Sequence, residues 1–125
     1  MDTYTLTPTP KTPKLVFDFD SGSFEISGRS IPENSIEFYK PLMAKLENYI
    51  MTPAPQTHLT ISLEYFNTSS SKCLVEIFRK MERASDKSKI KISWYYEVED
   101  DDMLESGEDF KKIVKVPIEL ISVEE

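Results

Sequence analysis

Cysteine and histidine are almost missing from this sequence, and their scarcity excludes several kinds of site. The 125 residues include one cysteine, Cys73, and one histidine, His58. A single cysteine cannot form an internal disulfide or a thiolate zinc site, and a single histidine leaves most metal sites and catalytic triads incomplete. We therefore expect no metal and no cofactor. Cys73 is interpreted as a core residue, and His58 is assigned no role.

Long hydrophobic runs are also absent. No stretch approaches the about 18 consecutive apolar residues that a membrane-spanning helix needs. The first residues, MDTYTLTPTPKTPK, have an acid at position 2 and lack the apolar segment of a secretory signal. These features predict a protein of the reducing cytoplasm with no membrane insertion.

Acidic residues outnumber basic ones, so the net charge is −7. This charge argues against nucleic acids and anionic membrane surfaces as partners. The excess is local, because 8 of the 22 acids lie between Glu97 and Asp109 with no base among them. The order of these acids does not match a calcium-binding EF-hand loop. We interpret residues 97–109 as a solvated or partner-docking face and keep a cation-binding module as an alternative.

The chain length fits one domain, preceded by a short arm. Pro8, Pro10 and Pro13 alternate with threonines, and because proline fixes φ and lacks an N–H, residues 1–13 are expected to be extended or disordered. Residues 14–125 form the single predicted domain.

Alternation of apolar and polar residues predicts the strands. Leu15, Phe17 and Phe19 share one face of a first strand, and a turn at residues 20–22 leads to a second strand through residues 24–26, as in a β-hairpin. Further strands are predicted at residues 57–66, 90–98 and 114–123. Pro117 indicates that the last strand lies at an edge or contains a bulge.

Helical spacing of apolar residues predicts three helices between these strands. Residues 30–33 have capping-box spacing, and because Pro41 interrupts the run, we expect either a kink or a helix proper from about 41 to 51. A second helix is expected from about 70 to 83, and a third ends near Lys112. The order β-β-α-β-α-β-α-β predicts an α/β (α+β) fold with a single mixed β-sheet and helices packed on it.

Asp18 and Asp20 follow the first strand with the spacing of the paired aspartates of haloacid dehalogenase-type phosphatases. In those enzymes the first carboxylate is the nucleophile and the second is a general acid. The expected strand context differs here, because the strand alternates instead of being an apolar run. A small phosphatase-like enzyme remains an alternative beside a turn aspartate on a solvated strand.

The run Asn67-Thr68-Ser69-Ser70-Ser71-Lys72 stands between a predicted strand and a predicted helix. One such residue suffices to cap a helix, so the row of hydroxyls exceeds that need. A phosphate has a charge of about −1.5 to −2, and the free N–H groups of a helix N-terminus stabilise it. The run therefore indicates either a helix cap or a phosphorylation site.

Together with Leu63, Glu64, Tyr65 and Phe66, this run resembles the signature of the SiaC family of bacterial regulatory phosphoproteins. Four other stretches are similar to that family: residues 9–13, 28–33, 94–97, and the acidic run ending at 106–109. The resemblance implies a regulatory domain whose topology is similar to that of anti-sigma-factor antagonist (STAS) domains. Because the sequence shows no strong nucleophile–base pair, we expect no enzymatic activity.

The resemblance also implies partners and roles. A dedicated protein threonine kinase would phosphorylate Thr68, and a PP2C-type phosphatase would remove the phosphate. The unphosphorylated form would bind and activate a diguanylate cyclase, which connects the protein to cyclic-di-GMP signalling and biofilm formation. Asn67, Ser69, Ser70, Ser71 and Lys72 would be neighbours and caps of the phosphosite. Partner contacts are expected from Arg29, Tyr65, Phe66 and Glu97.

Overall fold

The computed structural model describes residues 3–124, which form six strands and three helices. Along the chain these are β1 (Thr3–Leu6), β2 (Lys14–Asp18), β3 (Ser23–Ser30), α1 (Ser35–Tyr49), β4 (Gln56–Phe66), α2 (Thr68–Ala84), β5 (Lys89–Glu97), α3 (Asp101–Ile113) and β6 (Ile118–Val123). None of these helices combines the length and the apolar character required to cross a lipid bilayer.

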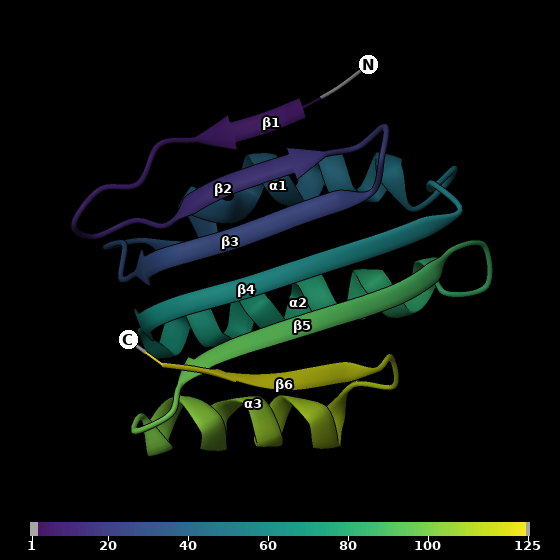
Figure 1. The fold of residues 1–125 in the computed structure, drawn as a ribbon. Coiled ribbons are helices and arrows are strands. Elements are labelled where there is room, and N and C mark those ends of the chain that lie inside the picture. Colours follow the sequence, from purple (N-terminus) through teal and green to yellow (C-terminus); the bar gives the residue numbers. More distant parts are fainter. Residues whose placement is uncertain (1–2, 125) are drawn as a thin grey trace.

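All six strands belong to one sheet in which spatial order follows chain order (Figure 1). The pairs β1–β2 and β2–β3 are antiparallel, whereas β3–β4, β4–β5 and β5–β6 are parallel and are connected through α1, α2 and α3. The predicted single mixed sheet with packed helices is confirmed. Because the last four strands are parallel, their carboxyl ends and the N-termini of all three helices lie at the same edge of the sheet.

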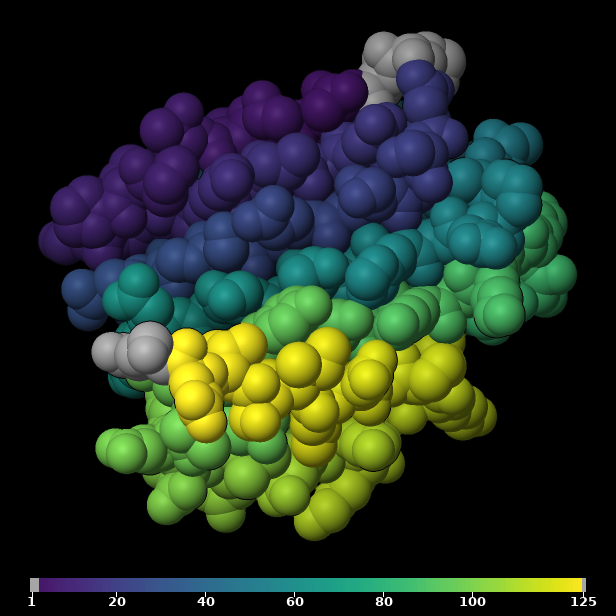
Figure 2. Space-filling model, viewed as in Figure 1, coloured from purple at the N-terminus to yellow at the C-terminus, as the bar shows by residue number. Residues whose placement is uncertain are grey.

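The helices cover one face of the sheet and leave the other face open. Along β4, Leu59, Ile61 and Leu63 are buried beneath the helices, and the residues between them point the other way. Trp94 of β5 packs against α3 by donating a hydrogen bond from Nε1 to the carbonyl oxygen of Met103, 3.0 Å away. Figure 2, drawn from the side of the open face, shows strand residues with no helix in front of them.

The N-terminal segment contains a strand that the sequence interpretation did not include. Within residues 1–13, Thr3–Leu6 pairs with Leu15–Asp18 of β2 as an edge strand. Tyr4 and Leu6 pack against the core. Their alternation with Thr3 and Thr5 is the sequence pattern of a strand, but the prolines that follow favour an irregular segment. The backbone N–H of Ile31 also donates to the carbonyl oxygen of Lys11 at 2.8 Å, which holds the proline-containing loop near the end of β3.

Helix α1 begins between the two predicted starting points, the capping box at residues 30–33 and Pro41, and is capped by a different residue. It runs from Ser35 through Pro41 without interruption, and the carboxamide oxygen of Asn34 accepts the hydrogen bond from the N–H of Glu37 at 3.1 Å. The predicted capping box at residues 30–33 is therefore wrong, as is a helix proper that starts at Pro41. Burial of Tyr39, Leu42 and Leu46 stabilises the helix despite the hydrogen bond lost at proline.

Helix α3 carries the acidic segment. Asp100 caps it by accepting from the N–H of Met103 at 3.0 Å, and Asp101 and Asp102 occupy its first turn, where carboxylates interact favourably with the helix dipole. Lys111 and Lys112 lie in the last turn. The predicted loop plus helix ending near Lys112 is confirmed.

Candidate functional site

Thr68 is the first residue of α2, directly after the cap residue Asn67. The side-chain oxygen of Asn67 accepts the hydrogen bond from the N–H of Ser70 at 2.9 Å, and its amide group donates to the carbonyl oxygen of Pro32 at 3.3 Å. Asn67 therefore both starts the helix and ties it to the segment before α1. Thr68 sits where β4 ends, at the sheet edge that carries the N-termini of the helices (Figure 1).

A network of hydroxyl groups lies beneath Thr68 and connects three elements. The Ser70 hydroxyl donates to the carbonyl oxygen of Ser30 at 3.0 Å and accepts from the Ser30 hydroxyl at 2.8 Å. The Ser30 hydroxyl also lies 2.6 Å from the hydroxyl of Tyr39 on α1. Ser35 of α1 contacts the Ser69 hydroxyl at 2.7 Å and the Ser70 hydroxyl at 3.1 Å. These bonds fix the first turn of α2 against β3 and α1.

Burial makes this network rigid and neutral. Ser30, Ser70 and Tyr39 have no exposed surface, and Ser35 is 2% exposed. Burial also raises the pKa of Tyr39 to about 12, partly opposed by its hydrogen bond with Ser30, so the phenol keeps its proton. Ser35 and Tyr39 are site residues that the sequence interpretation missed. In the sequence, Ser30 has only a capping-box spacing and a place in the family-like stretch 28–33.

The network separates Thr68 from its neighbours. Ser70 is buried and Ser69 is hydrogen-bonded, and Ser71 is half-buried. The side chain of Thr68 is exposed and its hydroxyl forms no hydrogen bond to any residue between 3 and 124. Within the run, the hydroxyls of Thr68 and Ser71 form no hydrogen bond to the described residues, and Thr68 is the more exposed of the two.

The remaining predicted site residues lie around this edge in different environments. Arg29 and Tyr65 are paired in register between β3 and β4, and both are exposed. Lys72 is exposed one turn after Thr68 on α2. Phe66 is half-buried, with its ring centroid 6.0 Å from that of Trp94, so it belongs to the aromatic cluster under α3. Glu97 lies at the end of β5, where the acidic segment begins.

The acidic segment lines open hollows at the same edge. One, of about 550 Å³, is bordered by residues of β4, β5 and β6 that include Glu64, Tyr95, Glu97 and Val123. Among residues 3–124, no three histidine, cysteine, aspartate or glutamate side chains converge to hold a metal ion. The alternative of a cation site at residues 97–109 thus has no ligand set in the structure.

The phosphatase alternative lacks the required geometry as well. Asp18 ends β2, which runs antiparallel to its neighbours, so it lies at the edge of the sheet away from Thr68. Its Oδ1 accepts from the N–H groups of Asp20 and Ser21 at 3.0 and 3.3 Å, which is the bonding of a turn aspartate. Asp18 and Asp20 therefore shape the β2–β3 turn.

His58 and Cys73, the scarce residues, are placed as side chains of the sheet and the core. His58 Nε2 lies 2.8 Å from the Ser93 hydroxyl on the open sheet face, and partial burial lowers the pKa of His58. Cys73 is buried on α2, and burial raises the pKa of its thiol, which disfavours the reactive thiolate.

Comparison with known proteins gives concordant matches over nearly the whole chain. The sequence model described as SiaC family regulatory phosphoprotein matches residues 6–123. An uncharacterized protein of Pseudomonas aeruginosa strain UCBPP-PA14 is 27% identical over 110 residues, or 87% of each chain. The structure of SiaC of Pseudomonas aeruginosa matches with a TM-score of 0.89 and 25% identity, over 98% of this chain and 100% of that one.

A further solved structure has the same fold. It contains the diguanylate cyclase SiaD in complex with its activator SiaC from Pseudomonas aeruginosa, and it matches with a TM-score of 0.88 and 24% identity. The match covers 96% of this chain and 99% of the other.

Proposed function

The chain belongs to the SiaC family of regulatory phosphoproteins, and on this premise we propose that it is the phosphorylatable component of a bacterial partner-switching pathway. The unphosphorylated form binds and activates a diguanylate cyclase, which links the protein to cyclic-di-GMP signalling and biofilm formation. A dedicated threonine kinase phosphorylates Thr68 and blocks this binding, and a PP2C-type phosphatase reverses the modification. All of these steps take place in the cytoplasm.

The observation that carries this proposal is the isolation of the Thr68 hydroxyl. It is exposed at the first position of α2, whereas Ser69 and Ser70 are engaged by Ser35 and Ser30. A kinase that reaches this turn of the folded chain can therefore phosphorylate the Thr68 hydroxyl without first breaking a hydrogen bond. The N–H groups at the start of the helix also favour the phosphate once it is attached.

The choice of partner is supported by the relatives. SiaC of Pseudomonas aeruginosa, 25% identical to this chain, is the activator in the complex with the diguanylate cyclase SiaD. We assign the chain no catalysis of its own. This is supported by the turn role of Asp18, the engagement of His58 with Ser93, and the burial of Cys73.

Phosphorylation would act through local electrostatics. A phosphate on Thr68 introduces about two negative charges at an exposed position, and covering those charges with a partner surface carries a large desolvation penalty. A hundredfold loss of affinity requires only about 2.7 kcal/mol of differential binding. The rigid hydroxyl network under Thr68 supports a switch in which the backbone stays the same and only partner binding changes.

The phosphosite is tested by incubating the purified chain with its cognate kinase and ATP and mapping the phosphate by mass spectrometry. Wild type and Ser69→Ala are expected to carry one phosphate on Thr68, and Thr68→Ala is expected to carry none. Stoichiometric phosphate at another residue, with Thr68 bare, would overturn the assignment.

The partner is tested by immobilising Thr68→Ala and fully phosphorylated wild type as baits for a cell lysate. A diguanylate cyclase, identified by peptide mass spectrometry, is expected on the first bait and not on the second. Calorimetry with the purified cyclase should then show at least a hundredfold weaker binding of the phosphorylated chain. Equal affinities of the two forms would exclude the switch.

A further inference from the structure

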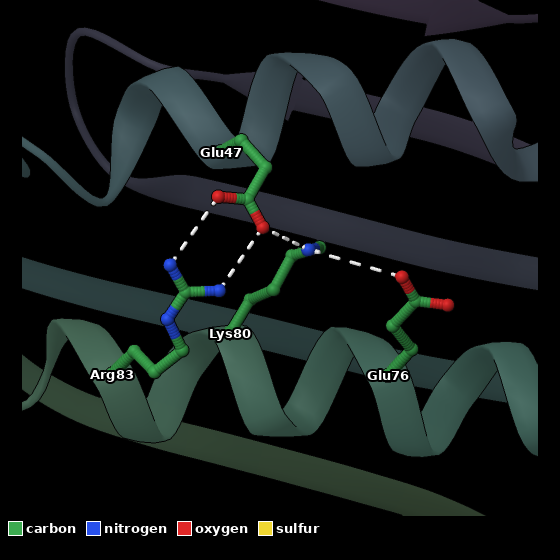
Figure 3. Close-up of polar contacts among 4 residues, drawn as sticks. All are labelled: Glu47, Glu76, Lys80 and Arg83. Carbon is green, nitrogen blue, oxygen red and sulfur yellow. Dashed lines mark hydrogen bonds and ion pairs between the residues drawn. The ribbon is translucent and has the colours of Figure 1, made fainter.

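The seam between α1 and α2 is closed by charged side chains in the half toward the helix C-termini (Figure 3). The Glu47 carboxylate accepts hydrogen bonds from Lys80 and from Arg83, whose Nη1 and Nη2 lie 3.0 and 3.3 Å from its oxygens. Lys80 also lies 3.8 Å from Glu76, one turn earlier on α2. These contacts show that the flank of α1 bearing Glu47 faces α2.

The other half of the seam, toward the helix N-termini, has an exposed apolar residue instead. Ile36 stands eleven residues, or about three helical turns, before Glu47, and so it lies on the same flank of α1. It is 72% exposed, more than any other large hydrophobic side chain among residues 3–124. On α2, Lys72 stands one turn before Glu76, is exposed, and forms no ion pair within the described chain.

Ile36 and Thr68 are held together as parts of one rigid unit. Ile36 follows Ser35, Thr68 precedes Ser69, and the hydroxyls of Ser35 and Ser69 lie 2.7 Å apart. Ser35 is also bonded to the buried Ser70 hydroxyl at 3.1 Å, so neither first turn moves without the other. A partner surface that covers the joined first turns of both helices reaches Thr68 and Ile36 together.

We propose that Ile36, Thr68 and Lys72 form one docking strip and that Ile36 is its apolar anchor. The occupant is the diguanylate cyclase, so this inference rests on the proposed function and adds the chemistry of the contact. The cyclase surface that fits is an apolar pocket for the isoleucine side chain with a carboxylate beside it for Lys72. Burying one isoleucine side chain in such a pocket is worth about a tenfold to hundredfold gain in affinity.

The strip also gives the proposed phosphate at Thr68 two ways to weaken partner binding. It places a dianion at the border of the apolar contact, where it must be desolvated. It also stands four residues before Lys72, the spacing at which opposite charges on a helix pair, so the phosphate takes the cation that the partner carboxylate uses. A single modification thereby weakens both elements of the docking strip.

The test compares two exposed hydrophobic residues near opposite ends of α1. Ile36→Ser is expected to weaken calorimetric binding of the unphosphorylated chain to the purified cyclase captured by the Thr68→Ala bait by at least tenfold. Met51 is 66% exposed just beyond the C-terminal end of α1, and Met51→Ser is expected to change the affinity less than twofold. Both variants should melt within about 2 °C of wild type, since neither side chain is buried.

Lys72→Gln supplies the second measurement. It should weaken binding at least threefold for the unphosphorylated chain and have no effect on residual binding of the phosphorylated chain. The docking strip would be overturned if the affinity of Ile36→Ser for the cyclase stays within twofold of wild type. It would also be overturned if Ile36→Ser and Met51→Ser lose affinity equally. If Thr68 phosphorylation still weakens binding in that case, the proposed function survives. Capture of no cyclase would overturn both.

Discussion

The hydroxyl groups of Ser35 and Ser69 lie 2.7 Å apart and join the first turns of α1 and α2. This contact spans 34 residues of sequence and places two helix N-termini side by side at the carboxyl edge of the parallel strands. It also separates the hydroxyl that is engaged, on Ser69, from the one that is not, on Thr68. The stability of this junction is therefore the first property to measure.

Ser35→Ala is expected to lower the free energy of unfolding by about 1–2 kcal/mol, because it removes a buried hydroxyl that bonds both Ser69 and Ser70. Urea denaturation measures the change. Ser122→Ala, at an exposed strand position, serves as the control and should stay within about 0.5 kcal/mol of wild type. Equal stabilities of Ser35→Ala and wild type would show that the network contributes nothing to folding.

Asn67→Ala is expected to cost about 1–2 kcal/mol of stability, more than the equivalent change at the other asparagine cap, Asn34→Ala. The side chain of Asn67 accepts from Ser70 and donates to Pro32 in a partly buried position, whereas the side chain of exposed Asn34 accepts only from Glu37. Thermal unfolding of the two variants gives the comparison. A larger loss of stability for Asn34→Ala would contradict the larger contribution assigned to Asn67.

Gly107→Ala is expected to destabilise the chain by about 1–3 kcal/mol, although alanine favours helix formation over glycine by about 1 kcal/mol. A Cβ at this position of α3 would lie 2.6 Å from Cδ1 of Trp94 and 2.8 Å from Cδ2 of Leu120. Ser106→Ala, at the preceding half-buried position, is the control. The measurement is the urea midpoint, and a stabilised Gly107→Ala variant would show that α3 is not packed this closely on β5.

Glu47→Gln is expected to reduce stability at neutral pH and to lose this effect in acid. Hydrogen bonds from Lys80 and then Arg83 hold the pKa of Glu47 below its ordinary value of 4.5. A lowered pKa in the folded state contributes stability above pH 4.5, which is lost as pH falls through the folded value. Urea midpoints of both proteins between pH 7 and pH 3 should converge toward the acid end. A constant difference across this range would assign the loss to packing.

Several elements were predictable because their signals are local. The alternation of Leu15, Phe17 and Phe19 marked β2, and the spacing of Leu74, Ile77, Phe78 and Met81 marked α2. Thr68 was placed at a helix start because a strand pattern changed to a helical one beside it. The family signature around Thr68 suggested a role that its exposed position in the structure supports.

Other features were missed because their cause lies far along the chain. Ser30 has the spacing of a helix cap, yet its hydroxyl bonds Tyr39 and Ser70, and Asn34 caps α1 instead. The strand at Thr3–Leu6 forms because β2 offers it an edge, which the prolines that follow do not reveal. From sequence alone, Gly107 is expected only to lower helix stability, whereas in the structure it allows α3 to approach Trp94 closely.

The sequence by itself determined the periodicity of each element, the acidic character of residues 97–109 and the position of Thr68 at a helix start, since these follow from neighbouring residues. Only the tertiary structure decided that Ser69 and Ser70 are held by Ser35 and Ser30 while the Thr68 hydroxyl is left unengaged. The same holds for the exposure of Ile36, whose neighbour Ser35 bonds Ser69. The reason is physical: helix and strand periods arise from local backbone geometry, whereas hydrogen-bond partners and exposure depend on which distant segments the sheet brings together.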